Sequence, residues 1–127
     1  SSWSGHERNC AFLNTADDRF ADVSNAIGFD VPADSRGLAI SDWDQDGDLD
    51  VWLTNRTAPS LQFFRNNLSN SRFVAFKLIG KTSNRDAIGA SVEVVTESTK
   101  PRLIRSLKAG EGYLSQSSKW LHFGLPE

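Results

Sequence analysis

Five aspartates alternate with other residues in the segment "DWDQDGDLD", which runs from Asp42 to Asp50. Alternate positions of a tightly turning loop project to the same side, so Asp42, Asp44 and Asp46 can converge on one point. Gly47 occupies the sixth position and supplies the backbone freedom for a sharp turn. Two carboxylates ~4 Å apart repel each other by about 1 kcal/mol even in water. The pattern therefore predicts a loop that a divalent cation would stabilise.

Calcium fits this set of ligands best. It accepts six to eight oxygen ligands in a flexible geometry, whereas magnesium requires a tighter octahedron and retains its waters. We expect side-chain ligands from Asp42, Asp44 and Asp46. The seventh residue of such a loop offers its carbonyl, so Asp48 would bind through its backbone and Asp50 would complete the shell. The metal prediction thus comprises all five aspartates.

The aspartate segment allows three other interpretations. An EF-hand is excluded, because that motif needs a bidentate Glu at position twelve and flanking helices, whereas this chain has Leu53 there and strand-like flanks. A solvated acidic turn without metal is the simplest alternative. A general acid/base pair, as in glycoside hydrolysis, would need two carboxylates in contrasting environments, which five similar acids around one point do not favour.

Short apolar segments separated by turn residues run through the whole chain, and several alternate with a period of two, which is typical of half-buried strands. The segments that predict strands are "CAFLN", "RFADV", "GLAISDW", "DVWLTN", "LQFFRN", "FVAFKLIG", "ASVEVVTE", "PRLIRSL" and "KWLHFGL". Helical periodicity lasts no more than a turn or two, in "DVSNAIGFD" and "SNRDAIGA". The sequence predicts an all-β, sandwich-like module of short antiparallel strands with a calcium-binding hairpin loop.

Charge divides the 127 residues into two halves. Residues 1–70 carry five arginines against eleven acidic residues, a net charge of −6, and residues 71–127 carry nine basic against five acidic residues, a net charge of +4. The turn-rich stretch "RNNLSNSR", residues 65–72, is the best candidate boundary. Modules this small bury little surface, so we expect them to pack against each other or to be stabilised by a ligand.

Composition argues against several classes of function. The basic half contains no basic run, so nucleic-acid binding is not expected. No stretch approaches the ~20 apolar residues of a membrane span. Cys10 is the sole cysteine, in a strand-like segment, and is expected to be a buried, inert thiol; His6 and His122 are far apart in sequence and are expected to be core or surface residues.

The segment "SNRDAIGA" is polar and then abruptly apolar. A structural interpretation is a turn capped by Ser83 or Asn84, with Arg85 and Asp86 pairing with each other or binding backbone, ended by Gly89. A functional interpretation is a recognition loop that offers Arg85 to a carboxylate or sulfate. The structural interpretation is favoured.

The segment "KAGEGYLSQSS" combines glycines, serines and the sole tyrosine. It could bind a saccharide, with Tyr113 as a stacking platform and Gln116 as a polar contact. We favour a structural role, in which glycines form a hairpin or bulge and hydroxyls satisfy backbone groups at a strand edge. No GxSxG motif is present, and Ser115 has no evident base.

The tryptophans divide in the same way. Trp52 and Trp120 lie within apolar strands and are expected in the core, whereas Trp3 and Trp43 lie where exposure is possible. Trp43, inside the aspartate loop, could shield a bound ion from one side.

Two parts of the chain resemble known families. "GLAISDWDQDGDLDVWLTNR", preceded by "FADVSNAIGF", resembles an FG-GAP or VCBS-type repeat, a calcium-binding blade unit. "GKTSNRDAIGASVEVV" followed by "GYLSQSSKWLHFGL" resembles the ASPIC/UnbV domain, which commonly follows such repeats. These resemblances divide the chain into a segment of residues 1–70 and a β domain of residues 71–127. Propellers of the first family contain several blades, and this chain has at most one.

The resemblance implies a secreted, periplasmic or cell-surface calcium-binding protein without catalytic activity. It carries the metal ligands onto the side chains of Asp42, Asp44, Asp46 and Asp50 and the carbonyl of Asp48. We expect calcium to be structural and the partner to be a protein or glycan at the cell surface, in adhesion or protein interaction. The alternatives are a carbohydrate-binding accessory domain and, less favoured, a hydrolase.

Overall fold

A computed structural model describes residues 6–15, 17–67, 72–96 and 102–125. These residues form antiparallel strands in small sheets and no helix, so the predicted all-β class is confirmed. Every strand of the described residues overlaps a segment that the sequence predicts, although two strands begin one or two residues earlier than predicted, at Ser35 and at Arg72. The strands are β1 (Phe12–Asn14), β2 (Phe20–Asp22), β3 (Ser35–Ser41), β4 (Asp50–Asn55), β5 (Leu61–Phe64), β6 (Arg72–Lys77), β7 (Ser91–Val94), β8 (Leu103–Ser106) and β9 (Trp120–Leu125).

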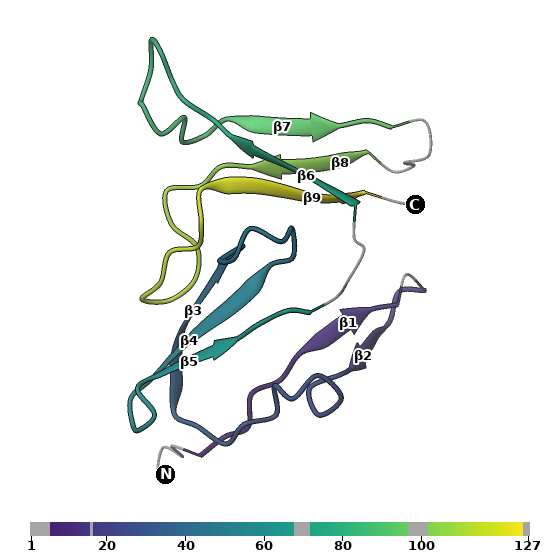
Figure 1. The fold of residues 1–127 in the computed structure, drawn as a ribbon, viewed down its shortest axis with the longest axis vertical. Coiled ribbons are helices and arrows are strands. Elements are labelled where there is room, and N and C mark those ends of the chain that lie inside the picture. The colour runs from purple at the N-terminus through teal and green to yellow at the C-terminus, as the bar shows by residue number, and fades with distance from the viewer. Residues whose placement is uncertain (1–5, 16, 68–71, 97–101, 126–127) are drawn as a thin grey trace.

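The first half of the chain contains two sheets. Strands β3, β4 and β5 form a meander in that order, and β1 pairs with β2 in a separate hairpin (Figure 1). The rings of Phe29 and Phe64 lie 4.9 Å apart, and this contact packs the segment after β2 against β5. The β3–β4 pairing ends at Ser41 opposite Asp50, so the aspartate loop closes this hairpin.

The second half is a small sandwich of two two-stranded sheets, β6 with β9 and β7 with β8 (Figure 1). Leu107, Leu121 and Phe123 form its buried centre. Apolar side chains from β6, β7 and β8 pack around this centre, because alternate residues of a strand face inward; they include Val74, Phe76, Val92, Val94 and Leu103. The sandwich-like expectation therefore holds for residues 72–96 and 102–125.

The two halves touch along the free edge of β3. Ile40 N–H donates to Ser117 Oγ over 3.1 Å, and Ser118 N–H donates to the Ile40 carbonyl over 2.9 Å. A Cβ atom at Gly37 would lie 3.1 Å from the Leu114 carbonyl oxygen, so this chain segment crosses β3 closely. The expectation that the two halves pack against each other is confirmed. The middle of the proposed boundary, residues 68–71, lies outside the described residues.

Several expectations about individual residues were wrong. Cys10 is exposed, because the short β1–β2 hairpin beside it is itself largely exposed. Trp120 is 50 % exposed, because it begins β9 on the face opposite the sandwich core, where Lys77 Nζ lies 5.9 Å from its ring centroid. Trp52 is partly buried, and Trp43 is exposed as expected. Trp3 lies outside the described residues.

The helical turn proposed around Ser24 is a hydrogen-bonded turn and not a helix. Ile27 N–H donates to the Val23 carbonyl over 3.1 Å, and Gly28, with φ of 71°, ends the turn. Within the part of the chain that the structure describes, there is no helix of the length and hydropathy needed to span a membrane.

Candidate metal centre

The aspartate loop projects from one end of the three-stranded sheet, where the β3–β4 hairpin reverses. It turns tightly because two residues adopt left-handed backbone conformations, Gln45 with φ of 61° and Gly47 with φ of 98°. The role predicted for Gly47 in the sharp turn is confirmed. Gln45 adopts this region without being glycine, which is uncommon outside turns.

Hydrogen bonds within the loop fix the orientation of its carboxylates. Gly47 N–H donates to Asp42 Oδ2 over 3.2 Å. Asp48 N–H donates to Asp46 Oδ1 over 3.0 Å. Each bond ties a carboxylate to the backbone two to five residues further on, so the side chains turn inward around the loop.

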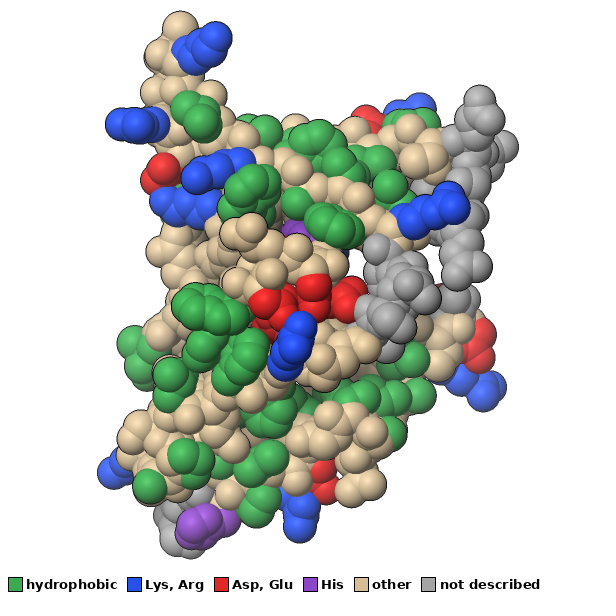
Figure 2. Space-filling model, viewed as in Figure 1, with side chains coloured by type: hydrophobic (Ala, Val, Ile, Leu, Met, Phe, Trp, Pro, Cys, Tyr) green, Lys and Arg blue, Asp and Glu red, His purple; other side chains and the backbone are tan. Residues whose placement is uncertain are grey.

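Asp42, Asp44 and Asp46 are brought together as the alternating spacing predicts. Each offers one carboxylate oxygen, and these three oxygens all lie within 4.8 Å of one another. Asp42 is partly buried and the other two are exposed. Acidic side chains form a visible patch in the middle of the face shown in Figure 2. This arrangement concentrates negative charge at the junction between the two halves.

The other two predicted ligands are placed differently. Asp50 is completely buried and is not part of the three-carboxylate cluster. Its Oδ2 accepts from Trp43 N–H over 3.1 Å and its Oδ1 accepts from Asn66 N–H over 2.8 Å. Asp50 thereby fastens the start of the loop to the chain that leaves β5. The side chain of Asp48 is likewise outside the cluster.

A basic side chain lies across the cluster. The Arg65 guanidinium forms an ion pair with Asp44 and a second contact with Asp46, with 3.4 Å between Nη2 and Oδ2. Arg65 directly follows β5, and β5 runs antiparallel to β4, so its end lies beside the start of β4 and the loop. One arginine facing three carboxylates leaves the site with an excess of negative charge.

The second half of the chain contributes side chains that contact the other side of the loop. His122 is buried in β9, and its Nε2 lies 3.5 Å from Asp42 Oδ2. The imidazole ring stacks on Phe73 of β6, with 4.9 Å between ring centroids and 7° between planes. The Phe73 ring in turn packs against Gly47. The aspartate loop is therefore fastened to β6 and β9.

One carboxylate oxygen of Asp42 has no hydrogen-bond partner among the described residues. Asp42 Oδ1 is buried and accepts no hydrogen bond from any described residue. A buried carboxylate oxygen without a partner carries a desolvation cost. The pKa of Asp46 is lowered, chiefly because Asp48 N–H donates to its carboxylate and further because Arg65 is near, so this side chain remains ionised.

Sequence reasoning missed the three side chains that surround the loop. Arg65 could have been found, because a residue at the end of the third strand of a meander lies beside the first hairpin. His122 and Phe73 had no local signal, since they lie far from the loop in sequence and only the packing of the two halves brings them to it.

The segment "SNRDAIGA" forms the capped turn that the structural interpretation predicts. Asn84 is the cap: its Oδ1 accepts from Ile88 N–H over 2.6 Å. Gly89 ends the turn with φ of 93°. The main partner of Asp86 is Lys119, which sequence reasoning did not predict, and the nearby Arg85 adds a weaker electrostatic contribution that also lowers the pKa of Asp86.

The segment "KAGEGYLSQSS" also has a structural role. Ser117 Oγ satisfies the backbone N–H of Ile40 at the edge of β3, as the favoured interpretation predicts. Gly112, with φ of 80°, makes the bend before this contact. Tyr113 is 69 % exposed and Gln116 is partly buried.

Comparison with known protein families finds a match to part of the chain. Residues 80–127 match the family described as ASPIC and UnbV. This match begins after β6 and does not include the aspartate loop. No curated protein and no solved structure matches the chain.

Proposed function

We propose that this chain is a non-catalytic calcium-binding module of a secreted, periplasmic or cell-surface protein, in which calcium is structural. The observation that carries the proposal is the convergence of Asp42, Asp44 and Asp46 on one point at the junction of the two halves. Loop, hairpin and neighbouring strands all contribute to that convergence.

The donor set suits a hard cation. The three converging groups are carboxylates, and oxygen is the ligand atom that calcium prefers. The unpartnered, buried Asp42 Oδ1 is an acceptor for which no described donor exists, as expected of a group that binds a cation. Asp42, Asp44 and Asp46 would hold the ion through their side chains, and Asp48 would add its carbonyl oxygen.

The surrounding contacts support a structural role for the ion. Asp50 and Gly47 already fix the course of the loop, so little ordering would remain on binding. His122 and Phe73 connect the same loop to the second half. Neutralising the carboxylates would remove their mutual repulsion and so stabilise both the hairpin and its contact with β6 and β9.

The resemblance to FG-GAP and VCBS-type repeats supports the same function. Such repeats bind calcium through an aspartate loop between two strands, as in the segment from Asp42 to Asp50. Extracellular calcium sites can be weak, with dissociation constants of roughly 10⁻⁴–10⁻³ M, because the ion is abundant there. We propose adhesion or protein interaction at the cell surface as the biological role, with a protein or glycan partner.

Calorimetric titration of the metal-free protein with calcium tests the proposal. We expect one binding site in the wild type and at least tenfold weaker binding in Asp44→Asn, because one charged ligand is lost. Asp17→Asn is the matched control, since Asp17 is an exposed acid outside the cluster. Absence of a calcium signal in the wild type, or equal affinity in Asp44→Asn, would contradict the proposal.

A further inference from the structure

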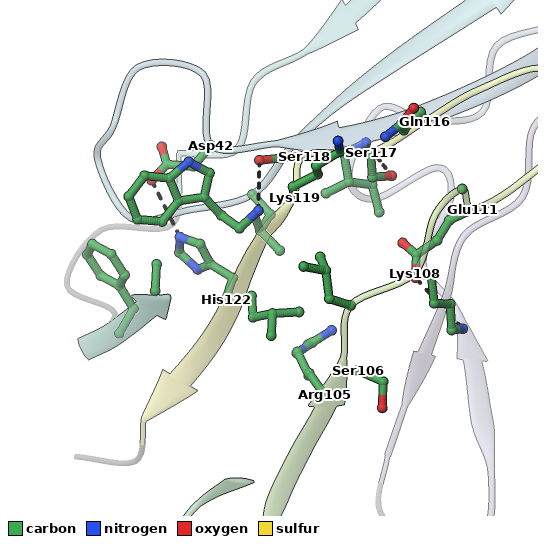
Figure 3. Close-up of a pocket in the computed structure, with 18 of the residues that line it drawn as sticks. Asp42, Arg105, Ser106, Lys108, Glu111, Gln116, Ser117, Ser118, Lys119 and His122 are labelled. Atoms are coloured by element: carbon green, nitrogen blue, oxygen red, sulfur yellow. Dashed lines mark hydrogen bonds and ion pairs between the residues drawn. The ribbon is translucent and has the colours of Figure 1, made fainter. Parts of the chain in front are cut away.

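A cavity of about 640 Å³ lies between the aspartate hairpin and strands β8 and β9 (Figure 3). Its walls come from both halves of the chain, with β3 and the loop on one side and the segments around β8 and β9 on the other. This volume suits a ligand the size of a mono- or disaccharide. The calcium proposal does not account for the cavity.

One wall of the cavity is rich in hydrogen-bond donors. Ser117 Oγ and Ser118 Oγ each accept a backbone N–H, so each hydroxyl proton is left to donate. Gln116 lines the same wall, and its side-chain amide makes no hydrogen bond to any described residue. Figure 3 shows these three side chains together on one side of the cavity. Such a wall favours a ligand with many acceptor oxygens.

The opposite side contains a guanidinium that has no carboxylate partner among the described residues. Arg105 projects from β8 toward the cavity (Figure 3). Its guanidinium carbon lies 5.9 Å from the Phe123 ring centroid, and among the described residues it has neither an ion pair nor a hydrogen bond. By contrast, Lys108 faces Glu111 across 3.8 Å and Lys119 pairs with Asp86. Arg105 is thus the cation of this cavity that is available to an anionic ligand.

The acidic and aromatic residues of the lining further restrict the class of ligand that the cavity can bind. Asp42 lies on the side of the cavity away from Arg105, with His122 between them (Figure 3), so an anionic group would bind at the Arg105 side. Trp120, which is 50 % exposed, also lines the cavity. Sugar rings stack their apolar faces on exposed aromatic rings, and a guanidinium can hold a carboxylate through two parallel hydrogen bonds.

We propose that this cavity binds an acidic saccharide of the uronate type. The uronate carboxylate would bind Arg105, and the sugar hydroxyls would accept from Gln116 and the two serines. Tyr113, the platform considered from the sequence, is not part of the described lining of the cavity. The site is independent of the metal proposal, since its main contacts lie outside the three-carboxylate cluster.

Titration of the 15N-labelled protein with a galacturonate disaccharide, followed by NMR in millimolar calcium, tests this inference. We expect shifts for Arg105, Gln116 and Ser117, and at least tenfold weaker binding of the methyl-esterified disaccharide, which keeps the shape and lacks the charge. Arg105→Gln should weaken binding of the free acid at least tenfold. Gln116→Ala should weaken it several-fold, which provides a second variant if Arg105→Gln fails to fold.

Two matched control variants test whether the effects are specific to residues that line the cavity. Arg102→Gln removes the same charge immediately before β8, where Arg102 pairs with Glu93 over 2.9 Å outside the cavity. Tyr113→Ala removes the exposed ring outside the cavity. Both variants should bind within twofold of the wild type.

Several results would overturn the inference. These are no binding of the disaccharide, equal binding of its methyl ester, or binding that depends on Tyr113 and not on Arg105. Equally tight, Arg105-dependent binding of a short poly-aspartate peptide would overturn the saccharide assignment in favour of an acidic peptide. Loss of calcium binding with retained disaccharide binding would count against the metal proposal alone.

Discussion

The ring of Phe73 occupies the space beside Gly47 that a side chain would need. A Cβ atom at Gly47 would lie 2.2 Å from Phe73 Cε1, well inside the contact distance of two carbons. Gly47 also has φ of 98°, so the position requires glycine for two independent reasons. The aspartate loop and β6 are therefore in direct contact, and a change at one residue of the loop must disturb both halves.

Gly47→Ala is predicted to destabilise the protein by about 3 kcal/mol, since left-handed strain and overpacking each cost roughly 1–3 kcal/mol. Gly89→Ala is the matched control, because Gly89 has φ of 93° but open space around its Cβ position. It should cost only about 1 kcal/mol. Urea denaturation in the presence and absence of calcium measures both. Equal losses of unfolding free energy in the two variants would show that the Phe73 contact adds nothing to the cost of Gly47→Ala.

Arg65→Gln is predicted to strengthen calcium binding. Arg65 contacts Asp44 and Asp46, two of the proposed ligands, and a cation would have to displace it or share these carboxylates. Arg65 is more than half exposed, so solvent screening limits the pair to at most about 1 kcal/mol, which corresponds to roughly fivefold in affinity. Isothermal titration gives the affinity, with Arg19→Gln as an exposed control. Weaker binding in Arg65→Gln would mean that the arginine supports the site.

Calcium is predicted to raise the thermal stability of the wild type. At 100 times its dissociation constant, a ligand that binds only the folded state contributes about 2.7 kcal/mol. For a chain of this size, that corresponds to a rise in Tm on the order of ten degrees. Calorimetry in millimolar calcium and in chelator measures the shift, and Asp44→Ala should abolish most of it. Equal melting temperatures in both buffers would contradict a structural role for the ion.

Asp22 is predicted to make stability depend on pH. Its Oδ1 accepts from Ser24 Oγ over 2.5 Å and from Ser24 N–H over 3.0 Å, and these bonds, the side-chain bond first, lower the pKa of Asp22 below its ordinary value of 3.8. A lowered pKa stabilises the folded state above the unfolded pKa, and the contribution disappears as pH falls through the folded pKa. Asp22→Asn should therefore be less stable than the wild type at pH 7.

The stability difference between the wild type and Asp22→Asn should shrink below about pH 4 and vanish at lower pH, where Asp22 is protonated. Chemical denaturation at a series of pH values follows it. Asp18→Asn is the control, because Asp18 is an exposed acid in the β1–β2 connection, outside the turn that holds Asp22 and Ser24. A difference of the same size at pH 7 and pH 2 would rule out the ionised carboxylate as its source.

The sequence by itself determined the strands and the acidic cluster. The alternation in "ASVEVVTE" and the short apolar run that opens "FVAFKLIG" indicate strands, and the structure has strands at both places. Asp42, Asp44 and Asp46 could be predicted to converge because the contacts lie within one hairpin loop, where spacing alone sets geometry. The turn ended by Gly89 is local in the same sense.

Only the tertiary structure decided what surrounds these local features. His122 and Phe73 reach the loop because the second half packs on the first, and no periodicity within either half encodes that packing. Trp120 is half exposed for the same reason, since an apolar strand does not reveal which of its residues a neighbouring sheet will cover. The cavity beside Arg105 exists only where segments distant in the chain meet, so local spacing could not predict it.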